Sequence, residues 1–260
     1  MGKSDKEKVR LGGMALANGV LVHGPTSWAC AVRTDDGKVK VVARRKRLLG
    51  SRVKNPLLRG PARLAEAFAF LPEVKRALPE AQLPFTRGRV LKSMLASAVV
   101  LNVVRRTRLS GTVKELMGGL MAFAPAVLSL REGSVAAYHG AEHITIGTYE
   151  HGEKRAREHE RCGTHLVGPL FATATAGNLL AGRAPLRFRP AARATAAVGA
   201  VAASTELFAW MQRNPEHPFA RALARPGHEF QHRVATEEPT RAQLEVAEAA
   251  LNACLGLEES

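Results

Sequence analysis

Residues 28–44 read WACAVRTDDGKVKVVAR, and this stretch decides the fold of the N-terminal part of the chain. Two runs rich in β-forming residues, 28–34 and 38–44, are separated by Asp35-Asp36-Gly37. An Asp-Gly pair between two such runs is a strong signal for a β-hairpin. Residues 11–24 (LGGMALANGVLVHG) place four glycines among apolar residues, which indicates two further short strands with a turn. We therefore expect a small antiparallel sheet over residues 11–46.

From about residue 60 the pattern becomes helical, with apolar residues at helical spacing and prolines in the gaps. The expected fold is α+β but mostly α, with a small N-terminal antiparallel sheet followed by a helical bundle. We expect three parts: a disordered N-terminus over 1–10, a small β subdomain over 11–60 and a helical domain over 61–260. The helices are expected over residues 61–77, 88–107, 112–130, 133–158, 163–181, 191–213 and 240–255.

The composition excludes several classes of protein. The chain has 260 residues, of which 46% are hydrophobic and 23% charged, so it can bury a substantial core and is not a disordered or collagen-like chain. The three cysteines, Cys30, Cys162 and Cys254, are too scattered for a disulfide framework, which indicates a reducing compartment.

Positive charge is high and unevenly placed. The formal net charge is +15, and ten Lys or Arg with no acidic residue lie between Asp36 and Glu66. Such a balance favours anionic partners, either acidic lipid headgroups or nucleic acid. No aromatic interleaving or nucleic-acid motif accompanies these basic runs, so we predict no nucleic-acid-binding residues.

Four apolar segments are candidates for crossing a membrane, which requires about 20 apolar residues. Each is short or interrupted by polar residues, and composition alone therefore favours a soluble bundle with Ala-rich core helices. The segments are Ser93–Val104, Leu116–Leu130, Cys162–Gly182 and Thr195–Gln212.

The sequence His139-Gly140-Ala141-Glu142-His143 carries the strongest chemical signal. On a helix, His139 and His143 lie four residues apart on one face and can bind one metal ion together. The H-x-x-E-H order is the inverzincin pattern of zinc enzymes, in which the glutamate is the catalytic acid or base. We therefore predict a divalent metal, zinc by preference, bound by His139 and His143, with Glu142 as general base.

A catalytic zinc usually has three protein ligands. We predict Glu206 as the third, because a carboxylate in the apolar stretch 195–212 must be neutralised, paired or metal-bound. Cys162 is expected to open a helix, which makes it an alternative ligand or a reactive thiol. A single histidine is more often a surface or hydrogen-bonded core residue than a ligand. The remaining candidates for alternative ligands or supporting residues are Glu150, His159 and His165.

Several stretches that span most of the chain in order resemble the YqhQ-type bacterial family, domain of unknown function 1385, described as a predicted metal-dependent enzyme. The resemblance implies a helix-rich protein of the bacterial cytoplasmic membrane with a metal site at His139, Glu142 and His143. It also places Glu150, Cys162 and Glu206 on family motif positions. The matching stretches are GGMALANGVLVHGPTSWACAVRTDDGKV, NPLLRG, YHGAEHITIGTYEHGE, RCGTHL, STELF and TEEPTRAQLEVAEAAL.

Together these observations predict a membrane-associated, metal-dependent hydrolase-like protein acting on an amide or ester. The alternative is a non-catalytic membrane scaffold whose basic loops bind anionic lipid or a protein partner. A soluble, cytoplasmic protein that binds nucleic acid is the third hypothesis, and it requires salt-dependent binding.

Overall fold

The computed structural model describes residues 8–47, 53–83, 88–131 and 133–260. Four strands form one antiparallel sheet in the order β1-β2-β3-β4, as the sequence predicts. The Asp-Gly hairpin joins the last two strands, and Gly37 has a φ of +81°, a conformation that favours glycine. The strands are β1 (Gly12–Leu16), β2 (Gly19–His23), β3 (Ser27–Arg33) and β4 (Val39–Arg45).

Nine α-helices follow in the described part of the chain, with short 3₁₀ and π segments between some of them. This confirms the mixed but mostly helical fold. The helices are α1 (Pro56–Ala69), α2 (Leu71–Ala77), α3 (Gly88–Arg106), α4 (Gly111–Leu130), α5 (Val135–His151), α6 (Val167–Gly182), α7 (Arg189–Arg213), α8 (Pro218–Phe230) and α9 (Arg241–Glu258). The 3₁₀ segments are η2 (Gly163–Leu166) and η3 (Leu186–Phe188), and the π segment is η4 (Gln231–Ala235).

Strands β2 and β3 are buried on both faces, because their alternate side chains pack against different helices, whereas β4 is mostly exposed. Val20, Val22 and Ala29 join the core that α5 and α9 form on one face. Leu21 and Trp28 join the core formed on the other face by residues 70–83, which include α2. This three-layer unit of the sheet with α2, α5 and α9 is called the head below.

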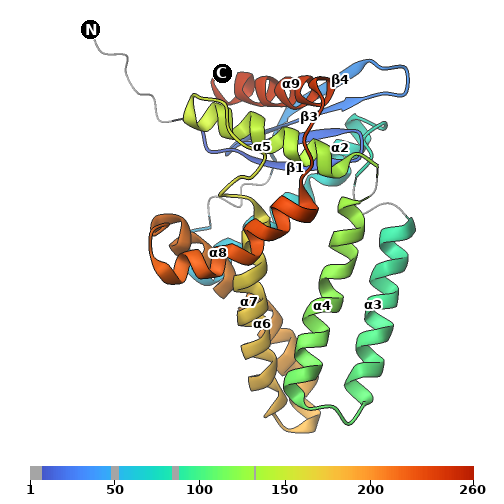
Figure 1. Ribbon diagram of the computed structural model, residues 1–260, viewed down its shortest axis with the longest axis vertical. Helices are drawn as coiled ribbons and strands as arrows, with labels where there is room; N and C mark the ends of the chain where they lie inside the picture. Colours follow the sequence, from blue (N-terminus) through green and yellow to red (C-terminus); the bar gives the residue numbers. More distant parts are fainter. Residues whose placement is uncertain (1–7, 48–52, 84–87, 132) are drawn as a thin grey trace.

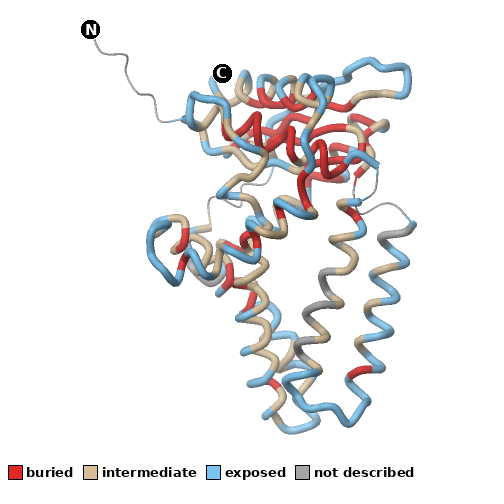
Figure 2. Tube along the Cα trace, in the orientation of Figure 1, coloured by how far each residue is buried: buried red, intermediate tan, exposed pale blue. Residues whose placement is uncertain are grey.

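Two long helical hairpins, α3–α4 and α6–α7, extend away from the head and are called the arm (Figure 1). Buried residues gather in the head, whereas the arm is mostly of intermediate or exposed burial (Figure 2). Helices α4 and α6 contact each other, so the two hairpins form one bundle.

One described helix is long and apolar enough to cross a membrane. It covers Leu186–Arg213, which is η3 followed by α7, and only 22% of its most apolar window is buried inside the protein. Glu206 lies inside this helix, as the predicted helix over 191–213 requires.

The helices differ from the predicted ones chiefly in three respects. The segment 61–77 contains two helices, since α1 ends at Ala69 and α2 starts at Leu71 before Pro72. The helix predicted over 133–158 stops at His151, where Gly152 adopts a left-handed conformation with a φ of +77°. Helix α8 was not predicted, because its Pro218 and Pro226 were read as breaks.

The predicted division into segments 11–60 and 61–260 stays a prediction. Two helices of the second segment, α5 and α9, complete the core of the sheet, which ties the two segments together. Of the N-terminus predicted to be disordered, residues 1–7 lie outside the described residues, and the backbone N–H of Val9 donates to the hydroxyl of Tyr149.

Candidate metal centre

Helix α5 carries the H-x-x-E-H sequence through the middle of the molecule. It is buried almost throughout because its sides pack against the sheet, α9 and the segment after η4. Gly140 allows the segment after η4 to approach α5 closely, since a Cβ at that position would lie 2.2 Å from the carbonyl oxygen of Glu237. His139 and His143 lie on one face of α5, as predicted, with their rings 4.3 Å apart.

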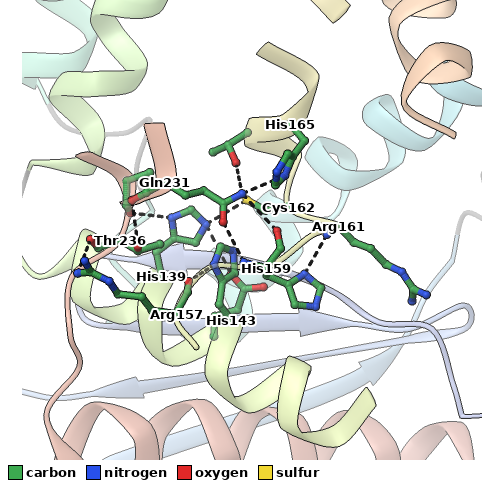
Figure 3. Close-up of polar contacts among 12 residues, drawn as sticks. His139, His143, Arg157, His159, Arg161, Cys162, His165, Gln231 and Thr236 are labelled. Atoms are coloured by element: carbon green, nitrogen blue, oxygen red, sulfur yellow. Dashed lines mark hydrogen bonds and ion pairs between the residues drawn. The ribbon is translucent and has the colours of Figure 1, made fainter. Parts of the chain in front are cut away.

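The loop after α5 returns over the two histidines and brings Cys162 to them (Figure 3). The side-chain amide of Gln231, fully buried at the start of η4, holds this loop in place. Its Oε1 accepts from the N–H of His159 at 2.9 Å, and its Nε2 donates to the Oγ1 of Thr164 at 2.6 Å. Such π segments are rare and often occur at functional sites.

Backbone carbonyls orient both imidazoles. The Nδ1–H of His139 donates to the carbonyl oxygen of Ala235 at 2.8 Å, and that of His143 donates to Arg157 at 2.6 Å (Figure 3). Each ring is therefore held in the tautomer whose Nε2 carries a lone pair. Donation of the second ring nitrogen to a carbonyl is the usual arrangement of metal-binding histidines.

One nitrogen of each ring and the Sγ of Cys162 lie within 4.8 Å of one another. The Sγ of Cys162 is 3.4 Å from the Nε2 of His139. Two ligands of a tetrahedral zinc ion lie about 3.4–3.6 Å apart at ordinary bond lengths. These three residues could therefore hold a metal ion with little rearrangement, and soft thiolate with imidazole suits zinc.

Glu142 lies beside this cluster but is not part of it. Its Oε2 is 3.9 Å from the Nε2 of both His139 and His143. The carboxylate rests on β1, because a Cβ at Gly13 would lie 2.3 Å from its Oε1. Burial raises the pKa of Glu142 to about 7, and no Lys or Arg among the described residues forms an ion pair with it.

Burial governs the protonation of the groups in and beside the cluster. Burial lowers the pKa of His143 to about 2, so its imidazole is neutral as a ligand must be. Burial and the nearby Glu142 raise the pKa of the Cys162 thiol to about 12. The Cys162 thiol is therefore protonated at neutral pH, and binding of a divalent ion here would require it to release that proton.

The structure does not bring Glu206 to this cluster, which corrects its assignment as the third ligand. Its carboxylate forms a two-bond ion pair with the guanidinium of Arg59 on α1. The premise that a carboxylate in an apolar helix needs a partner was sound, but the partner is a cation more than a hundred residues earlier. Cys162, predicted as an alternative ligand, lies instead with His139 and His143 in the group that could hold a metal ion.

The other predicted residues surround the cluster without joining its ligand atoms. The Nε2–H of His159 donates to the carboxylate of Glu150 at 3.1 Å, and the His159 ring lies 5.5 Å from that of His143. His165 is buried, and its Nδ1 lies 3.0 Å from the Nε2 of Gln231. The roles of Gln231, Gly13 and the two carbonyl acceptors were not predicted from the sequence. Gly12-Gly13 was the only sequence signal for any of them.

The fold and the cluster together define an α+β protein with a candidate metal centre made by His139, His143 and Cys162. A family model described as protein of unknown function (DUF1385) matches residues 84–257, which is more than half of the chain. The protein belongs to this family, as the resemblance indicates. No curated protein and no solved structure matches the chain.

Proposed function

We propose that this protein is a metal-dependent hydrolase of amide or ester bonds, with zinc bound by His139, His143 and Cys162. Three ligand atoms lie within 4.8 Å of one another, two from α5 and one from a loop about twenty residues further on, and this observation carries the proposal. Three protein ligands leave one position open on a tetrahedral zinc, which is the arrangement of catalytic sites.

Each residue has a distinct role in this proposal. His139, His143 and Cys162 hold the ion, and the carbonyls of Ala235 and Arg157 fix the two imidazoles. A bound divalent ion supplies Lewis acidity and lowers the pKa of coordinated water. Glu142, 3.9 Å from both Nε2 atoms, holds or transfers the proton. Its lack of a Lys or Arg ion-pair partner among the described residues leaves its carboxylate available for that role.

The first test is elemental analysis of the purified full-length protein. We expect about one equivalent of zinc, because a site of this kind binds its ion tightly at neutral pH. The variant His139→Ala/His143→Ala and the variant Cys162→Ser should each lose it. Glu206→Gln is the matched control and should keep the metal. Unchanged metal content in the double histidine variant would refute the site.

The second test separates metal binding from catalysis, with p-nitrophenyl acetate as the probe. The variant Glu142→Gln should retain the metal but lower kcat by about a hundredfold or more, the usual contribution of a general acid or base. Loss of metal in this variant would instead make Glu142 a ligand. A wild-type rate that does not depend on the metal would contradict the hydrolase.

A structural metal in a non-catalytic scaffold is the second candidate, and burial of the cluster favours it. His143 is 2% exposed and Glu142 7% exposed, so little of the site faces solvent. In this case removal of the metal by a chelator lowers Tm strongly, because the ion joins α5 to the loop that carries Cys162. Metal-dependent hydrolysis of the ester probe would exclude a purely structural role.

Association with the bacterial cytoplasmic membrane through the arm is also part of the proposal. Helix α3 exposes Leu95 (62%), Val99 (63%) and Val103 (59%), an apolar stripe that a soluble helix rarely presents. Its 19 residues are about 28 Å long, but only residues 93–104, about 18 Å, are uncharged, so its Lys and Arg ends would lie at the headgroups. The segment Leu186–Arg213 has 28 residues, which is more than a helix needs to cross a membrane. An integral protein should remain in the membrane pellet after an alkaline wash, whereas a peripheral one is released.

A further inference from the structure

The two hairpins of the arm end at the same end of the molecule, opposite the head (Figure 1). The hairpin tips are residues 105–114, the α3–α4 connection with the adjoining helix ends, and residues 183–193, the α6–α7 connection with the start of α7. Each tip contains four basic residues and no acidic residue. The basic residues are Arg105, Arg106, Arg108 and Lys114 in the first tip and Arg183, Arg187, Arg189 and Arg193 in the second.

None of these eight cations forms an ion pair with a carboxylate of the described residues, whereas most cations on the head surface do. Lys38, Arg44 and Arg241, for example, each lie within 4.0 Å of an acidic side chain. The Nε of Arg193 is buried without a hydrogen-bond partner. The tips therefore carry eight positive charges that the described protein does not neutralise.

Apolar side chains are exposed among these charges. Leu186 is 77% exposed, Phe188 52% and Leu109 44%. The guanidinium of Arg187 lies over the ring of Phe188, 4.6 Å from its centroid. Large apolar residues interleaved with arginines are typical of surfaces that sit in the headgroup region of a membrane, where the arginine reaches phosphates and the apolar chain reaches the acyl boundary.

We propose that the hairpin tips form a binding surface for anionic phospholipid headgroups. This inference rests on the membrane association proposed above and deepens it by naming a lipid class and the residues that select it. Cations near an anionic membrane surface attract it cumulatively. The exposed Leu109 and Leu186 favour a lipid over nucleic acid, since a phosphate-tracking surface gains nothing from aliphatic chains in water.

The test compares two variants of the full-length protein that lose the same charge. The tip variant is Arg105→Gln/Arg106→Gln/Arg108→Gln/Arg187→Gln. The head variant is Lys38→Gln/Lys40→Gln/Lys154→Gln/Arg241→Gln, which changes exposed cations distant from the arm. Each protein in neutral detergent is incubated with an equimolar mixture of phosphatidylglycerol and phosphatidylcholine, and native mass spectrometry counts the lipids that remain bound.

The wild-type protein and the head variant should retain phosphatidylglycerol in preference to phosphatidylcholine. The tip variant should lose about tenfold in the ratio of the two bound lipids, because four of eight headgroup contacts are removed. Circular dichroism should be the same for all three proteins, since the substituted side chains are exposed. Equal lipid ratios in the tip and head variants, or no preference in the wild type, would overturn the proposal.

Two further outcomes separate this proposal from its rivals. If RNA binds the wild type in a salt-dependent way and the tip variant loses that binding while its lipid ratio stays unchanged, the surface serves nucleic acid and the lipid proposal is wrong. If the alkaline wash releases the wild type but phosphatidylglycerol selection by the tips persists, membrane integration fails and the lipid surface stands as a peripheral one.

Discussion

Gly13 illustrates how one residue of the sheet shapes the candidate site. A Cβ there would lie 2.3 Å from the Oε1 of Glu142, and that carboxylate is buried against β1 with little room to move. We expect Gly13→Ala to destabilise the protein by about 1–3 kcal/mol, the usual cost of overpacking. Gly256→Ala is the control, because a Cβ on that α9 residue meets nothing within 4 Å. It should stabilise the helix by about 0.5–1 kcal/mol. Urea unfolding measures both changes, and the same sign for the two would refute this packing.

Gln231 is a second single residue that shapes the site, because it holds the loop that carries Cys162. Its amide makes hydrogen bonds to His159 and Thr164 that no solvent can replace in this buried position. Gln231→Leu should cost about 2–3 kcal/mol in unfolding free energy. After removal of metal, it should also raise the rate at which a maleimide labels Cys162 by about tenfold, through local opening of the loop.

The control for Gln231 is Gln212→Leu. Gln212 donates to the carbonyl of Glu160 in the same loop, but from an exposed position. Its loss should leave both the stability and the labelling rate nearly unchanged. Cys162→Ser identifies the labelled sulfur, since Cys30 and Cys254 are fully buried. Equal labelling of Cys162 in the Gln231 variant and the wild type would show that the amide does not hold the loop.

Among the elements, α9 packs on the sheet through its apolar face and is also hydrogen-bonded to it by a carboxylate near its C-terminal end. Glu258 accepts hydrogen bonds from the backbone and hydroxyl groups of Thr26 and Ser27, where the turn enters β3, at 2.6–2.9 Å. Burial opposes ionisation, but these donors outweigh it and hold the pKa of Glu258 below its usual 4.5. We expect Glu258→Gln to cost about 1–3 kcal/mol at neutral pH.

The loss of stability in Glu258→Gln should depend on pH. A carboxyl whose pKa is lower in the folded state stabilises the protein above its unfolded pKa, and this stability is lost as the pH falls through the folded pKa. The difference between wild type and Glu258→Gln should therefore be full at neutral pH and shrink below about pH 4.5, as urea unfolding across pH would show. The exposed neighbour Glu259 provides the control. A difference that does not depend on pH would mean that the charge of Glu258 is not what binds the turn.

Local signals allowed most elements to be predicted, and contacts distant in sequence explain what was missed. The Asp-Gly hairpin and the spacing of His139 and His143 depend on neighbouring residues, so the sheet and the histidine face of α5 were predictable. Helix α8 was missed because its packing against η2 stabilises it despite Pro226. At Gly227 of α8, a Cβ would lie 2.6 Å from the carbonyl oxygen of Thr164. The third ligand was misassigned for a similar reason, since no local pattern shows that Arg59 pairs with Glu206.

For the whole molecule, the contrast between a well-packed head and an apolar, exposed arm is the main physical feature (Figure 2). In water, the exposed apolar stripe of α3 would favour aggregation, whereas in a bilayer it would face lipid. The candidate metal centre lies in the head, and the loop that carries Cys162 leads directly through η2 into α6 of the arm. A membrane-embedded arm would therefore hold the site near the membrane surface, where its substrate would be an amphiphile or a membrane protein.

The lipid-facing role of α3 can be tested by placing charge on its stripe. Leu95→Asp/Val99→Asp introduces two acidic residues at positions more than 60% exposed, and each costs about 2.5–3.5 kcal/mol at the centre of a bilayer. We expect this variant to leave the membrane pellet after an alkaline wash, while the wild type stays. Val39→Asp/Val41→Asp is the matched control, because these valines of β4 are exposed apolar residues on the head. It should fractionate as the wild type does. If both variants remain in the pellet, α3 does not face lipid. If the wild type is itself released by the wash, the arm is not embedded, and its apolar stripe must be covered by protein.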